Sequence, residues 1–412
     1  MEGEAITALQ TNLLHLENQI TTLLEHVQRE EFKSYDYYDL WATELGQRAK
    51  QWSYRTEPAG HLFFSLPLLV CEIWLPFLRK PLGIKKRIYP ISVAHHGLAC
   101  LELYKYSRDE DWLQNAKNDA ELLIRLAISG AKGLCWGFPF VWSTNMGIIP
   151  SNQPAATQTS YGFDLFEQLW NITGDETYRT RLLAVARAMD EEYIDIPYHS
   201  GLAHTYHGRG YGDVIANAIS YRMRILAGAA SYGAPQYAEK AKKLALYLLE
   251  IQRPDGSWLY GQTLKNQFID HYHTCFVIKN LYRTNLVLNI PEISSAVERG
   301  INYYWENLFD KYGLPQPFAR QIRSNIVKRE SYDFAECLGL FALFGVQYGF
   351  THSRLELILN YLLQDFVLSD HALRFRIYHF PSARGYPYFR FGMTAAILSM
   401  AKLLNSPFMH NG

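Results

Sequence analysis

Cysteine is scarce in this chain of 412 residues. The five cysteines lie far apart, and none belongs to a Cys-x-x-Cys pair. Their odd number and wide spacing argue against both a disulfide framework and a thiolate zinc site. We therefore expect reduced, mostly buried thiols in a cytoplasmic protein. The cysteines are Cys71, Cys100, Cys135, Cys275 and Cys337.

A long uninterrupted apolar run is also absent. The most apolar stretch, residues 62–78, is interrupted by Pro67, Glu72 and Pro76, whereas a membrane-spanning helix needs roughly twenty apolar residues. The amino terminus lacks the basic segment and following apolar run of a secretory signal. We expect a buried helix at 62–78, a cytoplasmic location and no insertion into a membrane.

Neither sign of charge is in excess, since 40 lysine and arginine residues balance 40 aspartate and glutamate residues. A neutral chain has no overall field that favours nucleic acid or an anionic membrane surface. The sequence also lacks a P-loop, a GxGxxG turn after a strand, a GxSxG elbow and an HExxH helix. We therefore expect no nucleic-acid partner, no cofactor and no metal ion.

Aromatic residues, in contrast, are abundant. They make up 15% of the chain, with 29 tyrosines, 22 phenylalanines and 9 tryptophans. A large core explains most of them, because a chain of this length with 48% hydrophobic residues can bury one. Aromatic rings also line sugar-binding clefts, so the composition is compatible with a glycan as ligand.

The first helical segment carries a heptad pattern. Its apolar residues alternate spacings of four and three over nearly three heptads, which is the a/d seam of a coiled coil. Such a seam would either pair with a second copy, giving a homodimer, or dock on the body of the same chain. The residues of the seam are Leu9, Leu13, Leu16, Ile20, Leu23 and Val27.

From residue 60 onward the periodicity is mainly helical. Twelve helices in series fit six hairpins, and six hairpins can close into an (α/α)6 toroid with apolar inner helices and amphipathic outer helices. We therefore predict an all-α fold with an N-terminal helical extension at 1–58, a toroid at 59–412 and a short β-hairpin within 373–391. An open solenoid is the alternative. The helices are expected at 60–80, 90–106, 109–128, 156–173, 175–193, 212–232, 235–251, 268–286, 292–308, 330–347, 352–366 and 391–405.

Loops rich in glycine and aromatic residues recur between these helices. Their glycines are spaced by about 55–70 residues, and self-similarity at such a period indicates a repeat architecture. Each loop leads into a helix with polar side chains in its first turn, so loops and first turns are expected to surround one mouth of the toroid. The loops lie at 133–142, 201–212, 255–262, 312–319 and 382–392.

Several of these motifs resemble a known family. The segments SYDYYDLWATELG, WGFPFVW, GSWLYG and FIDHYHTCFVIKNLY are similar to those of uncharacterised bacterial proteins encoded in capsule, exopolysaccharide or O-antigen gene clusters, and the resemblance covers nearly the whole chain. It implies an (α/α)6 toroid and a role in polysaccharide biosynthesis. The resemblance implies no particular reaction, so no catalytic residue follows from it.

The segment FIDHYHT places polar side chains in the first turn of a helix. Asp270 could cap that helix. It also lies three residues before His273, so the two share a face and the carboxylate could orient the imidazole for acid–base catalysis. His271 and His273 point about 200° apart and cannot chelate a metal ion together. The predicted catalytic residues are His273, Tyr272, Asp270, Glu336 and Asp213.

Other residues of the loops and first turns are predicted to bind substrate. Guanidinium groups pair with carboxylates and aromatic rings stack on sugars, so these residues suit an oligosaccharide or polysaccharide, including an acidic one. An ordinary structural role is the alternative for each. They are Trp136, Trp142, His204, Tyr206, His207, Arg209, Trp258, Asp333, Arg376, Tyr388 and Arg390.

Together these observations predict a glycan-active enzyme that serves the biosynthesis or modification of a bacterial surface polysaccharide. The favoured chemistry is proton abstraction beside a uronic carboxylate, giving epimerisation or β-elimination, with histidine and tyrosine as base and acid. An arginine from 374–390 would neutralise the carboxylate. The alternatives are a glycoside hydrolase with two carboxylates drawn from Asp213, Asp270, Asp333 and Glu336, and a non-catalytic glycan-binding or scaffold protein.

Overall fold

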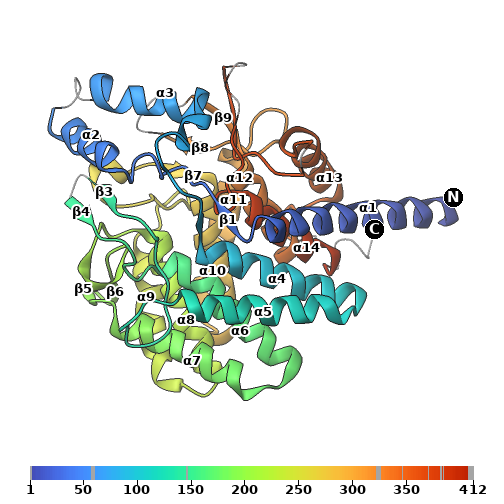
Figure 1. Cartoon of the computed structure of the whole chain (residues 1–412). Coiled ribbons are helices and arrows are strands. Elements are labelled where there is room, and N and C mark those ends of the chain that lie inside the picture. The colour runs from blue at the N-terminus through green and yellow to red at the C-terminus, as the bar shows by residue number, and fades with distance from the viewer. Residues whose placement is uncertain are drawn as a thin grey trace.

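The computed structural model describes residues 2–56, 61–144, 147–321, 326–345, 347–369, 371–380, 383 and 385–406, with the backbone alone at 2–13, 61 and 62. Helices dominate these residues, and the strands form small two-stranded ribbons (Figure 1). None of the described helices combines the length and apolar character that a membrane crossing requires.

Six of the described helices form a closed inner ring. Each of the six contacts the next inner helix along the chain, and the last, α14, contacts the first, α4. The structure is therefore a toroid and not an open solenoid. Nearly every residue of α8 and α14 is buried, because an inner helix has neighbours on all sides. The inner helices are α4 (Pro90–Ser107), α6 (Ala156–Thr173), α8 (Ala216–Ser231), α10 (His271–Leu288), α12 (Ser331–Phe344) and α14 (Met393–Leu404).

The outer helices are amphipathic, as predicted. Helix α5, for example, buries Leu113, Ala116, Ala120 and Leu123 along one face, and a helix with a single apolar stripe packs on one side only. Each outer helix contacts the inner helix that precedes it in the chain. They are α5 (Glu110–Leu126), α7 (Glu176–Glu191), α9 (Ala238–Glu250), α11 (Pro291–Asn307) and α13 (His352–Tyr361).

Helix α1 (Glu2–Arg29) packs against α14 and takes the sixth outer position (Figure 1). The boundary expected at residue 58 therefore separates α1 from the ring that it completes. The described part of its heptad seam is occupied by the chain's own core and is not open to a second copy. The buried seam residues are Leu16, Ile20, Leu23 and Val27, each at most 2% exposed, whereas the side chains of Leu9 and Leu13 lie outside the described residues.

The segment predicted as one helix at 60–80 is interrupted and lies outside the ring. It forms a π-helical turn (His61–Ser65), helix α3 (Leu66–Trp74) and a 3-10 turn (Pro76–Arg79). The α-helix stops just before Pro76, since proline restricts the preceding residue and lacks the amide hydrogen that continues a helix. Helix α2 (Glu44–Arg55) packs against the π-helical turn.

The strands brace the loops that lead into the inner helices. A β-hairpin was expected within 373–391, but the described residues there form one strand, whose partner comes from the loop before α12, with Arg376 opposite Glu330. The described ribbons are β1 (Lys33–Ser34) with β2 (Arg87–Ile88), β3 (Trp142–Thr144) with β4 (Gly147–Ile149), β5 (Ile196–Tyr198) with β6 (Gly201–Ala203), β7 (Ile269–Asp270) with β8 (Phe318–Arg320), and β9 (Val327–Glu330) with β10 (Arg376–Tyr378).

Two tryptophans anchor equivalent loops in the same manner. The indole of Trp136 donates to the carbonyl oxygen of Leu123 near the end of α5, and that of Trp258 donates to Leu248 near the end of α9, each at 2.8 Å. Their exposed fractions are 0% and 3%. Both were predicted to bind substrate, but they pack beneath their loops and cannot serve as sugar platforms.

Candidate active site

A cavity of about 110 Å³ opens at the end of the ring where the inner helices begin. The first turns of α6, α8, α10 and α12 contribute to its wall, as do the aromatic loops and the segment after α1. We call it the mouth cavity. Its aromatic side chains are Tyr38, Phe138, Trp142, Tyr206, Tyr221, Tyr260, Tyr272, Phe276, Tyr332 and Phe391, and its other side chains are Ile91, Thr157, Gln158, Asn217, His273 and Arg390.

The structure thus brings five of the predicted site residues to one cavity. Trp142 begins β3, Tyr206 and Arg390 lie on loops, and the other two lie in the first turn of α10. The first of the five, Trp142, and the last, Arg390, are far apart in the chain, so closure of the ring brings the site together. The five residues are Trp142, Tyr206, Tyr272, His273 and Arg390.

His273 and Asp270 form a hydrogen-bonded pair at the wall of the mouth cavity. Nδ1 of His273 lies 2.6 Å from Oδ2 of Asp270, as the spacing of three residues predicts. Asp270 is 4% exposed and makes no side-chain hydrogen bond to the helix amides, so it does not cap α10. Because Nδ1 donates to the carboxylate, the other ring nitrogen, Nε2, carries a lone pair and can accept a proton.

Tyrosines surround this imidazole. The rings of Tyr272 and Tyr260 lie 4.3 Å and 4.5 Å from that of His273, and Tyr332 stacks on Tyr272 at 4.9 Å. Burial raises the pKa of all three tyrosines well above the ordinary value, and nearby acids raise that of Tyr272 further. Their hydroxyl groups therefore keep their protons at neutral pH and can act as hydrogen-bond donors.

Two amides lie in the wall of the mouth cavity. The side-chain oxygens of Gln158 and Asn217 are buried and have no hydrogen-bond partner among the described residues, although a buried polar atom without a partner is costly. Neither residue was among the predicted site residues, but both lie in the polar first turns that follow the aromatic loops.

Arg390 contributes a cation to the mouth cavity while its charge is shared with Asp36. Its Nε and one terminal nitrogen each donate to that carboxylate at 2.7 Å, and its guanidinium lies 3.9 Å from the ring centre of Phe391. This pair ties the loop before α14 to the segment that carries Tyr38. Tyr38 was not predicted, because only the fold brings residues 38 and 390 together.

An acidic cluster lies behind the histidine pair. Glu330 accepts from Arg376 at 2.7 Å, and Arg376 stacks on Tyr37 at 4.3 Å. Burial, and then the charges of Glu330 and Asp270, raise the pKa of Asp333 well above its ordinary value. Arg376 and Asp333 were predicted to bind substrate, but they do not line the mouth cavity.

Four further predicted loop residues are engaged elsewhere. Arg209 pairs with Glu192 at 2.8 Å, and Asp213 accepts from Asn266 at 2.6 Å. His204 and His207 are buried, and burial lowers their pKa values to about 3 and about 4. None of the four lines the mouth cavity, although the ring of His207 packs behind Tyr206 at 4.9 Å, so their predicted roles in catalysis or binding find no support in its geometry.

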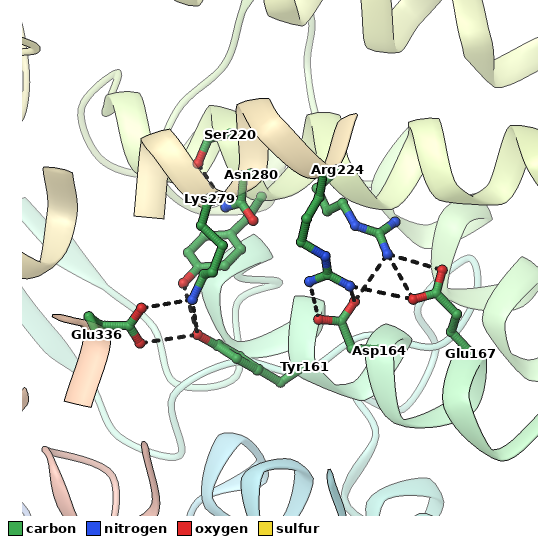
Figure 2. Close-up of polar contacts among 10 residues, drawn as sticks. Tyr161, Asp164, Glu167, Ser220, Arg224, Lys279, Asn280 and Glu336 are labelled. Carbon is green, nitrogen blue, oxygen red and sulfur yellow. Dashed lines mark hydrogen bonds and ion pairs between the residues drawn. The ribbon is translucent and has the colours of Figure 1, made fainter. Parts of the chain in front are cut away.

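Tyr388 and Glu336 are also outside this cavity. Tyr388 is 2% exposed and hydrogen-bonds to Glu72 and Arg79. Glu336 lies deeper in the ring, where it accepts from Lys279 at 2.7 Å (Figure 2). Its partner is therefore the lysine within the apolar segment FVIKNLY.

Lys279 also connects the ring interior with the mouth cavity. Its ammonium donates to the hydroxyl of Tyr161 at 3.1 Å, and that hydroxyl lies 3.3 Å from Tyr221 in the cavity wall. Burial raises the pKa values of both tyrosines well above normal. The chain of hydrogen bonds therefore consists of neutral hydroxyl groups that end on one lysine–glutamate pair.

One group of metal-ligating residue types lies close together among the described residues. Atoms of His96, Cys100 and Asp119 are within 4.8 Å of one another. Nδ1 of His96 is 2.5 Å from Oδ2 of Asp119, which is a hydrogen-bond distance. The three residues bridge α4 and α5 outside the mouth cavity, so they contribute to helix packing.

No protein-family model and no curated protein matches the sequence. Solved structures do match the fold. The chain superposes on the Lin0763 protein from Listeria innocua with a TM-score of 0.60 and 12% identity, covering 94% of this chain and 96% of the other. It also superposes on cellobiose 2-epimerase from Bacillus thermoamylovorans, with a TM-score of 0.58, 9% identity and coverages of 77% and 88%.

A third similar structure is an α-1,6-mannanase from Salegentibacter in complex with α-1,6-mannotriose. The TM-score is 0.51, with 10% identity and coverages of 78% and 90%. Together with the closed ring of helices, these likenesses define an all-α protein of the (α/α)6 toroid class. At such low identity they establish the fold alone.

Proposed function

We propose that the protein is a glycan-active enzyme that abstracts a proton from a sugar carbon, as a uronic-acid epimerase or lyase does. The observation that carries the proposal is the His273–Asp270 pair, whose imidazole lines the mouth cavity. Aspartate holds Nδ1, so Nε2 is available as the base. Tyrosines that keep their protons lie beside it and can return one.

The composition of the cavity favours this chemistry over hydrolysis. No aspartate or glutamate is among the described residues that line the mouth cavity, whereas most glycosidases need two carboxyl groups on either side of the bond that they cleave. Asp270 is committed to His273, and Glu336 is committed to Lys279. A carboxylate pair drawn from the predicted acids therefore lacks access to substrate.

In the proposed reaction, Nε2 of His273 takes the proton from the carbon next to the carboxylate of a uronic acid. The electron pair of the broken C–H bond moves into the carboxylate, and the guanidinium of Arg390 stabilises the added charge. A tyrosine proton returned to the opposite face gives the epimer. Departure of the neighbouring oxygen substituent, with the tyrosine proton, gives the unsaturated product of β-elimination.

The walls of the mouth cavity suit a sugar as ligand. Its volume of about 110 Å³ is room for roughly four water molecules, and the aromatic walls offer stacking surfaces on several sides. The resemblance to capsule and exopolysaccharide proteins suggests that the physiological substrate is a bacterial surface polysaccharide or its precursor, handled in the cytoplasm. The fold is also found in a cellobiose 2-epimerase, which supports the reaction class by analogy.

The test is solvent-deuterium exchange. The full chain is incubated in heavy water with oligosaccharides that contain uronic acids and with matched neutral ones, and products are analysed by mass spectrometry. We expect incorporation of deuterium, or a product that has eliminated its leaving group, with the acidic substrates only. A product that has gained water would indicate hydrolysis and contradict the proposal, and binding without exchange would indicate a non-catalytic glycan-binding protein.

Two variants sharpen the test. His273→Asn should lower the exchange rate by roughly 10²–10⁴-fold, which is the usual contribution of a general base. His199→Asn is the control, because His199 is an exposed histidine paired with Glu250 far from the mouth cavity. Exchange by His273→Asn at the rate of the control would refute the role assigned to His273.

A further inference from the structure

A second cavity, of about 270 Å³, lies toward the opposite end of the ring. The mouth cavity is built from the first turns of the inner helices, whereas this second cavity is lined by residues from the later parts of α4, α10, α12 and α14 and by the segment that follows α14. We call it the rear pocket. Its charged and polar lining residues are Glu102, Lys279, Arg283, Lys402, Asn405 and Ser406.

Three of these lining residues are cations, and two of them are matched by acids inside the ring. Lys279 pairs with Glu336 at 2.7 Å, and Arg283 pairs with Asp164 through two contacts of 2.6 Å and 3.0 Å. Glu336 lies on α12 and Asp164 lies on α6, which are both inner helices (Figure 2). The acids therefore hold these two cations from the inner side, and both cations still reach the rear pocket.

The acid of the rear pocket is also occupied. Glu102 accepts from Lys105 at 2.9 Å and from the amide of Asn405 at 3.0 Å. The remaining acid nearby, Glu167, accepts from Arg224 at 2.7 Å. Each acid around the rear pocket thus has a cation of its own.

Lys402 is the cation without an acid. Among the described residues, no carboxylate lies within 4 Å of the Lys402 ammonium, and the ammonium forms no hydrogen bond with any of them. Burial, and then the charges of Lys279 and Arg283, lower its pKa to about 8. Asp164 and Glu102 act in the opposite direction, but neither forms an ion pair with Lys402. Among the described residues, the rear pocket therefore has one lining cation, Lys402, without an ion-pair partner.

The negative ends of the inner helices stabilise cations in this region, and Lys402 does lie in the last turn of α14. Helix dipoles do not explain why three cations border one open pocket. An anionic ligand would account for both features, since it would neutralise the unmatched ammonium and accept hydrogen bonds from the exposed parts of Lys279 and Arg283.

We propose that the rear pocket binds the anionic group of a small molecule, a phosphate or a carboxylate, with Lys402 as its principal charge partner and Lys279 and Arg283 as further donors. This site is distinct from the mouth cavity and does not rest on the proposed function. A negative result in the glycan assay would therefore not bear on the proposal for the rear pocket.

The test is ligand-dependent thermal unfolding of the full chain at low ionic strength. Inorganic phosphate and acetate are each titrated against sodium chloride of equal ionic strength. We expect a saturable rise in the unfolding midpoint, of roughly 3 °C at a concentration one hundred times the dissociation constant. A response to phosphate alone assigns a phosphate site, and a response to acetate as well assigns a site that also takes carboxylates.

Three variants distinguish the rear pocket from general salt effects. Lys402→Met should unfold at an unchanged or higher temperature without ligand, because an unmatched charge is removed, but should lose the response to anions. Lys402→Arg should keep the response. Lys242→Met, which removes an exposed lysine of α9, should behave like the wild type. Absence of any response in the wild type, or an undiminished response in Lys402→Met, would overturn the proposal.

Discussion

Replacing Asp164 by asparagine perturbs the charge network that links α6, α8 and α10. Asp164 is 4% exposed and accepts hydrogen bonds from both terminal nitrogens of Arg283. Glu167, one turn further along α6, accepts from Arg224 (Figure 2). Asparagine has nearly the same shape as aspartate, so the substitution removes the charge without opening a cavity. Any loss of stability then measures the electrostatic contribution.

The size of the effect follows from the pKa of Asp164. Burial alone would raise it, but Arg283 and Arg224 outweigh burial and lower the pKa from 3.8 to about 2. At about 1.36 kcal/mol for each pH unit, this corresponds to roughly 2.5 kcal/mol of folding free energy. Arg283, whose side chain is 22% exposed, would keep only its 3.5 Å contact with Glu167, and the loss of its main partner can bring the total to about 3–5 kcal/mol. With about 2.1 cal/mol/K of unfolding entropy per residue, the unfolding midpoint should fall by roughly 3–6 °C.

The sign of the pH dependence follows from the same shift. Because the pKa is lowered in the folded state, the stabilisation by Asp164 is complete above the unfolded pKa of 3.8 and is lost as the pH falls through about 2. The difference between wild type and Asp164→Asn should therefore be equal at pH 7 and pH 5 and fall to about half at pH 3. Calorimetry or circular dichroism at the three pH values measures it.

Glu298→Gln serves as the matched control, since Glu298 is an exposed acid on α11. Its unfolding midpoint should stay within about 1 °C of the wild type. An unchanged midpoint for Asp164→Asn at pH 7, or a difference at pH 3 as large as that at pH 7, would refute the reasoning.

Two further predictions concern packing and the mouth cavity. Gly162→Ala should lower the unfolding midpoint by roughly 1–3 °C, because a Cβ there would lie 2.6 Å from the Trp136 ring. Gly339→Ala is the control and should be neutral or stabilising, because the nearest atom to its Cβ would be one hydroxyl at 3.3 Å. Equal shifts of the two midpoints in calorimetry would contradict this account. Burial lowers the pKa of Lys50 to about 8, and its ammonium lies 6.0 Å from the Trp142 ring centre, so acetylation of Lys50, followed by mass spectrometry, should show a midpoint near pH 8. A midpoint above pH 10, where an ordinary lysine titrates, would contradict the predicted shift.

Much of the fold could be predicted because its signals are local. The alternation of apolar and polar residues in α5 or α9 repeats every turn, so it predicts an outer helix without knowledge of any neighbour. The prediction of one helix at 60–80 was less successful. The apolar residues of this segment are compatible with a continuous helix, but α3 ends before Pro76 and a 3-10 turn follows. The role of α1 was open for a related reason: a heptad seam shows that an apolar face exists but not what covers it.

For the candidate site as well, contacts between residues close in the chain could be predicted, and long-range contacts could not. The pairing of Asp270 with His273 needed only a spacing of three residues on one helix. The burial of Trp136, in contrast, depends on a glycine of α6, and the engagement of Arg390 depends on Asp36, more than 350 positions away. Such contacts are invisible to a local pattern, because any polar or aromatic loop residue has many partners that it could meet.

The sequence by itself therefore determined the inner and outer helices from residue 90 onward, their order and the histidine–aspartate pair, because each is decided by residues within a few turns of one another. Only the tertiary structure decided which tyrosines surround that pair and which lysine is left without an acid. Those outcomes depend on closing a ring whose neighbouring helices are about 60 residues apart in the chain and whose first and last members, α4 and α14, must meet. The closure buries some charges in pairs and leaves Lys402 facing an open pocket.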